Sequence, residues 1–476
     1  MGPMSEDMMV RDLLALAPEA TLAIAAVAGL LLGSFLPRRR QWVVRVIAAA
    51  GAVGVVATTV PVWSDPARTV FDGSYGIDAA TNTVRLVVAS SLLVLLAMSA
   101  PETRRAARES EFVVLLVLSG LGAILLAGAE DLLVLIVAYL LASVPLYALV
   151  GFGKDGLGTE AALKYYLLGA LFGTTMVFGA AIVYGAGGAT AYPALGSSAH
   201  GAPQAALVVG AVAVLGGLLF KAGAVPAHFW IPDVVAGTRA PVAALVTTVP
   251  KLGAVVAIYR LAAMVLEPSG LNWRLLVAII ATATMVLGNF AAFFQTDVRR
   301  LLGYSTISQI GYLLVGVVAL DRSDLALPAV LIYLAAYAVT NLGAFAVVCA
   351  MPALRTIDDY TGKLRRHPSV IVALIVCLLG LIGTPPTGVF VGKLSVFTAA
   401  FDAGYGWLVV VAVANAVASV FYYLRWIVPT LSGARQGTAP EPINTWVAYA
   451  AATASIAVGI LAGPIMDAMT GPLAVP

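Results

Sequence analysis

The sequence predicts an all-α polytopic membrane protein with about fourteen transmembrane helices, arranged as two inverted five-helix repeats with broken helices 7 and 12. Hydrophobic residues make up 61% of the 476 residues and charged residues only 11%, whereas soluble domains carry about 25% charged residues. Apolar runs of the roughly 20 residues that a spanning helix needs recur along the whole chain. Two of these runs are too long for one straight crossing and contain proline. A soluble globular protein is therefore excluded.

Fourteen apolar segments are candidates for transmembrane helices. Each is long enough to cross the hydrocarbon core as a helix that rises 1.5 Å per residue. The predicted spans cover residues 18–36, 41–62, 82–100, 111–128, 131–151, 160–184, 204–235, 240–266, 273–294, 300–320, 327–350, 368–400, 405–430 and 444–466.

The seventh and twelfth spans are predicted to be broken helices. Pro226 lies in the seventh, and Pro385 and Pro386 lie in the twelfth. Proline removes a backbone donor and clashes with the preceding turn. Two such breaks in separate halves are typical of transporters built from inverted repeats. The expected units are residues 1–110 (helices 1–3), 111–266 (helices 4–8), 267–430 (helices 9–13) and 431–476 (helix 14).

The basic residues indicate an orientation in the membrane. With fourteen spans, 16 of the 27 lysines and arginines fall in loops on one side, and 5 fall on the other side. Cytoplasmic loops carry the excess of positive charge, so both termini are expected outside. The N-terminal tail lacks a basic stretch, and the first apolar run is expected to remain as a helix. The net charge of +3 is small and scattered, which argues against a nucleic-acid partner.

Six basic residues lie inside the predicted spans. Arg260 and Arg425 lie near helix ends, where a long side chain is expected to reach the interface. Lys164 follows Glu160 by one helical turn, which favours a local ion pair. Lys251 lies about 16 Å into the eighth span, near the middle of the membrane. The other two, Lys221 and Lys393, lie beside the proline breaks.

Three of these lysines, Lys221, Lys251 and Lys393, are candidates for a proton path. A charge at the bilayer centre costs at least about 2.5 kcal/mol and persists mainly where it faces a polar interior. The pKa of a buried lysine shifts readily, so its amine can carry a proton without a cofactor. The alternative is a structural role, in which the lysines bind carboxylates or carbonyls at helix ends. His228 follows the break in the seventh span and is either a proton relay or a buried histidine with satisfied hydrogen bonds.

No metal or redox cofactor is expected in this chain. The three histidines (His200, His228 and His367) are far apart, and the two cysteines, Cys349 and Cys377, do not form a CxxC pair. Iron–sulfur clusters usually require four thiolates. The GxGxxG match at residues 151–156 does not follow a strand, so it is interpreted as a loop. Any redox chemistry must therefore belong to partner subunits.

Several segments resemble subunit N of bacterial NADH–quinone oxidoreductase, respiratory complex I. The similarity runs in order from about residue 100 to 430 and is closer to subunit N than to its paralogues L and M. The segments that carry it are Glu160–Tyr166, Phe220–Val234, Arg299–Thr306, Asn341–Ala346, Gly383–Lys393 and Tyr422–Arg425.

The resemblance implies an antiporter-like subunit that translocates protons along a central hydrated axis, driven by quinone reduction in other subunits. Lys221, Lys251 and Lys393 match the axis lysines of that family, and Lys164 matches its sixth-helix lysine. The predicted proton path therefore consists of these four lysines and His228. NADH, FMN, iron–sulfur clusters and quinone are expected in partner subunits. The expected partners are subunits A, J and K on one side, M on the other, and the lateral helix of L, in a bacterial plasma (inner) membrane.

One position departs from the family pattern. The family's fifth helix carries a glutamate that pairs with the seventh-helix lysine, and Leu140 occupies that position here. The next carboxylates, Glu130 and Asp131, are ten and nine residues away. Pumping through another carboxylate or water, impaired pumping, and a non-pumping scaffold all remain open. A subunit of a cation/proton antiporter or of a related hydrogenase complex is a further alternative.

Overall fold

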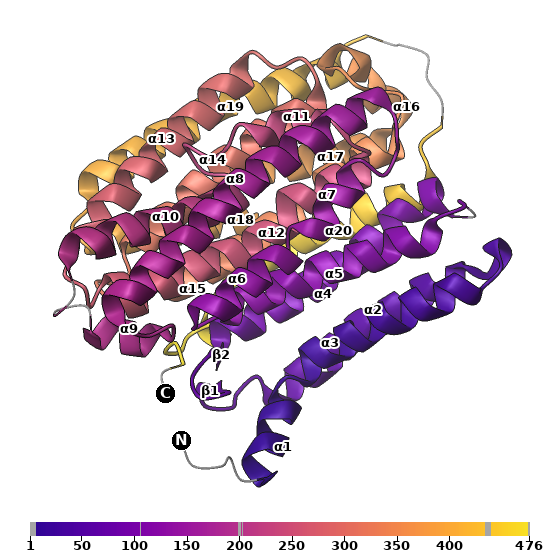
Figure 1. Cartoon of the computed structure of the whole chain (residues 1–476). Coiled ribbons are helices and arrows are strands. Elements are labelled where there is room, and N and C mark those ends of the chain that lie inside the picture. Colours follow the sequence, from indigo (N-terminus) through magenta and orange to yellow (C-terminus); the bar gives the residue numbers. More distant parts are fainter. Residues whose placement is uncertain (1–5, 105, 199–200, 202, 434–438, 475–476) are drawn as a thin grey trace.

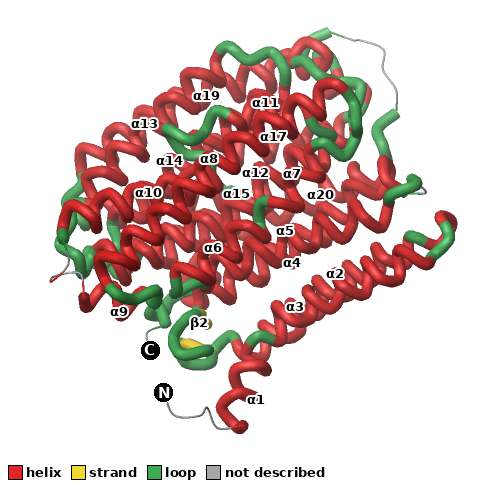
Figure 2. Tube along the Cα trace, in the orientation of Figure 1, coloured by secondary structure: helices red, strands yellow, loops and turns green. Residues whose placement is uncertain are grey.

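The computed structural model describes residues 6–104, 106–198, 201, 203–433 and 439–474. His200 and two of the counted basic residues, Arg105 and Arg435, lie outside this part. Helices account for most of the described chain, and two short strands form a hairpin (Figures 1 and 2). The elements are α1 (Glu6–Ala15), α2 (Ala17–Phe35), η1 (Arg38–Arg40), α3 (Trp42–Thr59), η2 (Val60–Val62), β1 (Arg68–Val70), β2 (Tyr75–Ile77), α4 (Ala79–Thr103), α5 (Glu109–Gly128), α6 (Leu132–Leu141), α7 (Val144–Val150), α8 (Gly156–Gly187), α9 (Tyr192–Ser198), α10 (Gln204–Ala222), α11 (Trp230–Gly237), α12 (Ala240–Leu261), η4 (Ala262–Leu266), α13 (Trp273–Phe293), α14 (Val298–Val318), α15 (Ala326–Ala350), η5 (Ile357–Tyr360), α16 (Lys363–Arg366), α17 (Pro368–Ile382), α18 (Gly388–Asp402), α19 (Gly406–Leu431), α20 (Pro442–Ile460) and α21 (Ala462–Ala468).

The predicted spans correspond to helices in the described part of the chain. Thirteen helical stretches there are long and apolar enough to cross a membrane, and they match every predicted span except the twelfth. The twelfth is divided into α17 and α18, each too short to cross alone. The prediction of a polytopic all-α membrane protein is therefore confirmed.

Both predicted helix breaks are present. The seventh span stops after α10 and resumes at α11, and the twelfth stops after α17 and resumes at α18. Each first half ends at a glycine in the left-handed region, Gly223 with φ +87° and Gly383 with φ +92°. This conformation is favourable for glycine because it has no Cβ. A third break, at Ala142 and Ser143 between α6 and α7, was not predicted.

Three helices form the centre of the bundle. The apolar windows of α12, α14 and α15 are 100%, 94% and 89% buried, whereas that of α2 at the edge is 39% buried. A helix that is apolar all round is stable where other helices surround it. In Figure 1, α2 and α3 lie side by side along one edge of the bundle. These three helices therefore place Lys251, Gln309 and Asn341 in the interior of the molecule.

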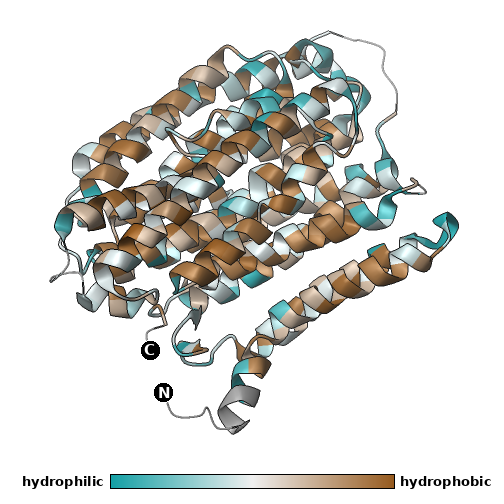
Figure 3. Ribbon diagram, viewed as in Figure 1, coloured by the Kyte–Doolittle hydropathy of each residue, from teal (hydrophilic) through white to brown (hydrophobic). Residues whose placement is uncertain are grey.

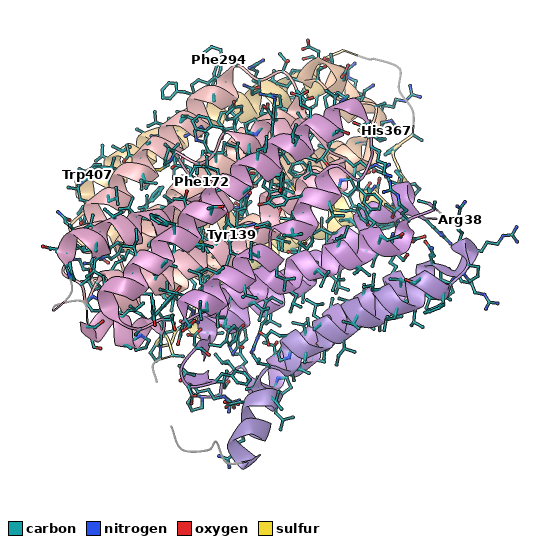
Figure 4. All side chains as sticks on the ribbon, viewed as in Figure 1. Arg38, Tyr139, Phe172, Phe294, His367 and Trp407 are labelled. Carbon is teal, nitrogen blue, oxygen red and sulfur yellow. The ribbon has the colours of Figure 1, made fainter. Side chains whose placement is uncertain are left out.

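The two ends of the bundle differ. Strands β1 and β2 pair antiparallel at one end, called here the hairpin end, and the C-terminal tail reaches the same end (Figure 1). Arg38 and His367 both lie at the opposite end, on different parts of the bundle (Figure 4). Helix middles are mostly apolar, and polar residues gather at both ends (Figure 3). This pattern fits a bundle that crosses a hydrocarbon layer.

The interpretation of Arg260 was wrong. Its side chain does not reach an interface but is fully buried at the hairpin end, where Asp78 and Glu130 bind it. These carboxylates come from segments far from Arg260 along the chain, so sequence reasoning could not pair them with the arginine. Arg425, by contrast, is partly buried and donates to the carbonyl of Phe293 at the end of α13.

Candidate functional site

Lys221 lies in the last turn of α10, next to the break in the seventh span. Its side chain is fully buried. The amine contacts the hydroxyl of Ser143 and donates to the carbonyl of Ala142 at 3.3 Å. The ring of Tyr139 lies 4.8 Å from the amine. The break between α6 and α7 thus supplies polar groups that a continuous fifth helix would keep in its own hydrogen bonds.

Lys251 lies in the middle of α12, the most deeply enclosed helix. Its amine donates to the carbonyl of Lys221 at 3.4 Å and lies 4.7 Å from the ring of Trp230. The side chain is fully buried. The carbonyl of Lys221 belongs to the last turn of α10, where carbonyls lack helical partners. The side-chain amine of Lys251 is therefore in direct contact with the backbone of Lys221.

Lys393 repeats this arrangement at the twelfth span. Its amine donates to the carbonyls of Leu381 and Ile382, at 3.1 and 2.8 Å, and lies 4.4 Å from the ring of Tyr312. Both carbonyls belong to the last turn of α17. The carbonyl end of a helix attracts positive charge. Two broken helices thus present their carbonyl ends to buried lysines.

The partners of these lysines are neutral. The ion pairs found among the described residues do not include Lys221, Lys251 or Lys393. Carbonyls and hydroxyls accept hydrogen bonds from both the charged and the neutral amine, whereas a carboxylate strongly favours the charged form. The arrangement matches the helix-end contacts that a structural role requires, and it also leaves each amine able to gain or lose a proton.

Buried polar side chains from α14 and α15 occupy the region between Lys251 and Lys393. Gln309 donates to the carbonyl of Leu381 at 2.8 Å, which also accepts from Lys393. The hydroxyl of Tyr333 donates to Gln309. These contacts extend the polar surroundings of Lys393 into the centre of the bundle.

One helical turn further along α15, Tyr337 continues this polar region toward α12. Its hydroxyl lies 2.8 Å from the carbonyl of Thr247 and 3.0 Å from the hydroxyl of Thr306, and its single proton can be donated to either acceptor. Asn341 donates to the hydroxyls of Thr247 and Thr248, at 3.0 and 2.9 Å. Both threonines precede Lys251 on α12 by about one turn. We call Gln309, Tyr333, Tyr337, Thr306, Asn341, Thr247 and Thr248 the polar bridge.

Sequence reasoning assigned no role to the polar bridge. Threonine, tyrosine, glutamine and asparagine occur in many spanning helices and do not stand out as a buried charge does. The spacing of Tyr333, Tyr337 and Asn341, each four residues apart, places them on one face of α15. That spacing was the available signal.

Two other predicted site residues, among those the structure describes, form no hydrogen bond or ion pair with the three buried lysines. Lys164 is partly exposed and pairs with Glu160 at 2.7 Å, as expected, and with Asp233 at 3.0 Å. Asp233 also pairs with Arg300, so this network joins α8, α11 and α14 beside a surface cavity of 330 Å³. His228 is buried in the linker between α10 and α11, and its Nδ1 has no hydrogen-bond partner among the described residues.

Leu140 does not face Lys221. Its side chain is 48% exposed, on the same outer face of α6 as Leu133 and Val137. Tyr139 and Ser143 instead face Lys221. As the sequence indicated, none of the described carboxylates forms an ion pair with this lysine.

A family model described as NADH:quinone oxidoreductase/Mrp antiporter, TM, matches residues 129–419. NADH-quinone oxidoreductase subunit N 1 of Streptomyces griseus is 52% identical over 463 residues, which cover 96% of this chain and 98% of that protein.

Solved structures share the fold. A chain of respiratory complex I from Thermus thermophilus, solved with bound aureothin, superposes with a TM-score of 0.83 and is 30% identical, covering 95% of this chain and 99% of that one. A chain of the Mrp complex from Dietzia sp. superposes with a TM-score of 0.84 at 20% identity, covering 96% of each chain, and shows the fold alone. The family match, the Streptomyces relative and the shared architecture show that the chain belongs to the subunit N family of the NADH–quinone oxidoreductases.

Proposed function

We propose that this chain translocates protons through Lys221, Lys251 and Lys393, as a membrane-arm subunit of an NADH–quinone oxidoreductase. The observation that carries the proposal is the placement of all three amines, fully or almost fully buried, against neutral acceptors. An amine with a neutral partner can exchange a proton, since neither charge state is locked by a counterion. The redox reaction itself belongs to partner subunits that hold NADH, FMN, iron–sulfur clusters and quinone.

The proposed route has two lysine sites joined by the polar bridge. Lys221 and Lys251 share the carbonyl end of α10, and Lys393 occupies the carbonyl end of α17. Hydroxyl groups can donate and accept at once, so Tyr337 and Thr306 can orient water or pass a proton between these sites. The matching ends of α10 and α17 support the proposal of two inverted five-helix repeats, residues 111–266 and 267–430.

Ser143 takes the role that the family glutamate at position 140 would have. Its hydroxyl and the Ala142 carbonyl hold the Lys221 amine without adding negative charge. The proton is then gated by movement of the amine between neutral acceptors and not by the opening of an ion pair. In the assembled complex, subunits A, J and K flank this chain on one side and M on the other, and the lateral helix of L contacts it.

The test is replacement of all three lysines by alanine in the assembled complex. Reconstituted into vesicles, the variant complex is expected to assemble and oxidise NADH but to move fewer protons per electron pair than the wild type. If the variant complex assembled and its proton transfer were unchanged, the chain would be a non-pumping scaffold. Transport that required sodium, by this chain without NADH-dehydrogenase partners, would show a cation/proton antiporter. Lys154→Ala, in an exposed loop, is the matched control.

A further inference from the structure

A cluster of buried charges at the hairpin end has no role in the lysine route. Arg260, on the last turn of α12, is fully buried between two carboxylates. Its Nη2 donates to both oxygens of Asp78 at 2.7 Å, and its Nη1 donates to Glu130 Oε1. We call Asp78, Glu130 and Arg260 the acid–arginine triad. One positive charge faces two acidic groups there.

The neighbouring charged groups do not neutralise the second negative charge of the triad. Arg85 binds Glu19 with two hydrogen bonds of 2.8 Å, and the hydroxyl of Tyr75 donates to the same Glu19. This pair is neutral as a whole. Asp131, next in sequence to Glu130, is turned away from the triad and accepts from the first amides of α6. With both triad acids ionised, the buried cluster would therefore keep one uncompensated negative charge, which is unfavourable in a dry interior.

The two acids are held differently. Asp78 accepts from Arg260 with both oxygens and from the amides of Thr81 at 3.0 Å and Ala474 at 2.9 Å. Burial raises the pKa of Asp78, but Arg260 and these amides outweigh burial, so the net shift is downward. Asp78 is thus the acid that stays ionised.

Glu130 has an oxygen that none of the described residues satisfies. Its side chain is fully buried, Oε1 contacts Arg260, and Oε2 has no hydrogen-bond partner. A buried carboxylate oxygen without a donor is costly, whereas a carboxylic acid carries its own proton there. Burial, opposed in part by Arg260, raises the pKa of Glu130 to about 7.

We propose that Glu130 Oε2 is a reversible proton-binding site, with Arg260 and Asp78 as its fixed counter-charges. Binding one proton turns the carboxylate into a carboxylic acid and makes the triad neutral, and release restores the negative charge. The site is distinct from the missing glutamate at position 140, because Glu130 precedes the start of α6 at Leu132 and Leu140 lies about 12 Å further along that helix. Its role as a proton site at the hairpin end of the molecule rests on the proposed proton translocation.

The C-terminal tail links the triad to a large cavity. The amide of Ala474 binds Asp78, and the preceding residues Thr470–Leu473 line a cavity of 1310 Å³ at the hairpin end. Tyr259, the neighbour of Arg260, lines the same cavity together with Asp321, Asp324 and Asp402. No triad residue lines this cavity itself, but Tyr259 and Leu473 on its wall are the sequence neighbours of Arg260 and Ala474. In the proposal, protons therefore exchange between the triad and solvent on this side of the molecule.

The test is infrared difference spectroscopy of the whole reconstituted complex, titrated from pH 5 to pH 9. The difference between wild type and Glu130→Gln is expected to contain one carboxylic-acid C=O band that shifts in D₂O and disappears as the pH rises through neutrality. Glu111→Gln, at an exposed position, is expected to leave this band unchanged. Absence of the band from the wild type minus Glu130→Gln spectrum would overturn the proposal.

Asp78→Asn tests the same site without removing Glu130. It removes one negative charge, so Glu130 is expected to ionise as the single partner of Arg260. The midpoint of the band is then expected to fall by at least one pH unit, a tenfold loss of proton affinity. An unchanged midpoint would overturn the triad as the cause. Either failure leaves the proton-to-electron ratio of the lysine variants unaffected, so the two proposals fail separately.

Discussion

At the scale of single residues, the contacts of the Lys221 amine are neutral. Lys221 contacts a serine hydroxyl and a backbone carbonyl, and the position expected to hold its counterion is an outward-facing leucine. A neutral acceptor binds the amine in either protonation state. In the proposed route, Lys221 therefore depends on the hydroxyl of Ser143.

We expect Ser143→Ala to lower proton translocation without preventing assembly. The change leaves the Lys221 amine with one acceptor fewer, and the loss of a hydrogen bond to a charged group costs about 1.5–3 kcal/mol, which corresponds to roughly tenfold or more in rate. Proton uptake by reconstituted vesicles measures the effect. The control is Ser119→Ala, because the Ser119 hydroxyl is buried and bonds only within α5. Equal rates for both variants would contradict the role of Ser143.

The raised pKa of Glu130 predicts that the stability of the folded protein depends on pH. Its folded pKa of about 7 exceeds the value of 4.5 for a free glutamate, so the folded state holds more protons than the unfolded state between these pH values. Stability is then lost as the pH rises from about 4.5 to 7, by up to about 3 kcal/mol. We expect the wild-type complex to melt at lower temperature at pH 8 than at pH 5, and Glu130→Gln to show a smaller decrease. If the melting temperatures of the wild type and Glu130→Gln fell in parallel with pH, Glu130 would not be the cause of the pH dependence.

The three lysines could be predicted because a charge inside an apolar run is conspicuous in any sequence. The burial of Arg260 could not be predicted, because the two carboxylates that bind it, on Asp78 and Glu130, lie more than 100 residues away along the chain. The polar bridge was hidden for a different reason. Hydroxyl and amide side chains in a spanning helix can bond to their own backbone, so only the packing of α12, α14 and α15 shows that they contact each other.

At the scale of elements, the two predicted breaks were found because the spans were too long and contained proline. The break in the fifth span was missed because that span has an ordinary length, and Pro145 fits the first turn of a new helix as well as a kink. The hairpin was missed because its strands have three residues each. Such short strands carry no periodic pattern.

Gly383 is expected to be required for proton transfer and not only for stability. A Cβ at this position would lie 3.0 Å from Cδ of Lys393 and would displace its side chain. Gly383→Ala should lower the proton-to-electron ratio of the complex. Gly188→Ala is the control, because Gly188 ends α8 in the same left-handed conformation, φ +72°, but faces open space.

Both glycine variants are expected to destabilise the chain by about 1–2 kcal/mol, the usual cost of a left-handed conformation for other residues. Thermal melting measures this shared effect, and proton uptake measures the difference. If both variants pumped like the wild type, the position of Lys393 against the carbonyl end of α17 would not matter for transport.

At the scale of the whole molecule, the excess of basic residues predicts that the hairpin end faces outward. Asp72 is exposed on the hairpin, and Arg39 is exposed between α2 and α3. In intact spheroplasts, a membrane-impermeant maleimide should label Asp72→Cys and not Arg39→Cys, and inverted vesicles should give the reverse. The native cysteines, Cys349 and Cys377, are buried and should react little. The opposite labelling pattern would show that the hairpin end faces the cytoplasm and would contradict the predicted orientation.

The most direct test of the lysine route is the proton-to-electron ratio of the complex with Lys251→Met. Lys251 is fully buried between the carbonyl of Lys221 and the ring of Trp230. Methionine fills similar space without a proton-carrying amine. We predict that this variant assembles and moves fewer protons per electron pair than the wild type, while Lys154→Ala matches the wild type. An unchanged ratio in Lys251→Met would contradict proton translocation through the buried lysines.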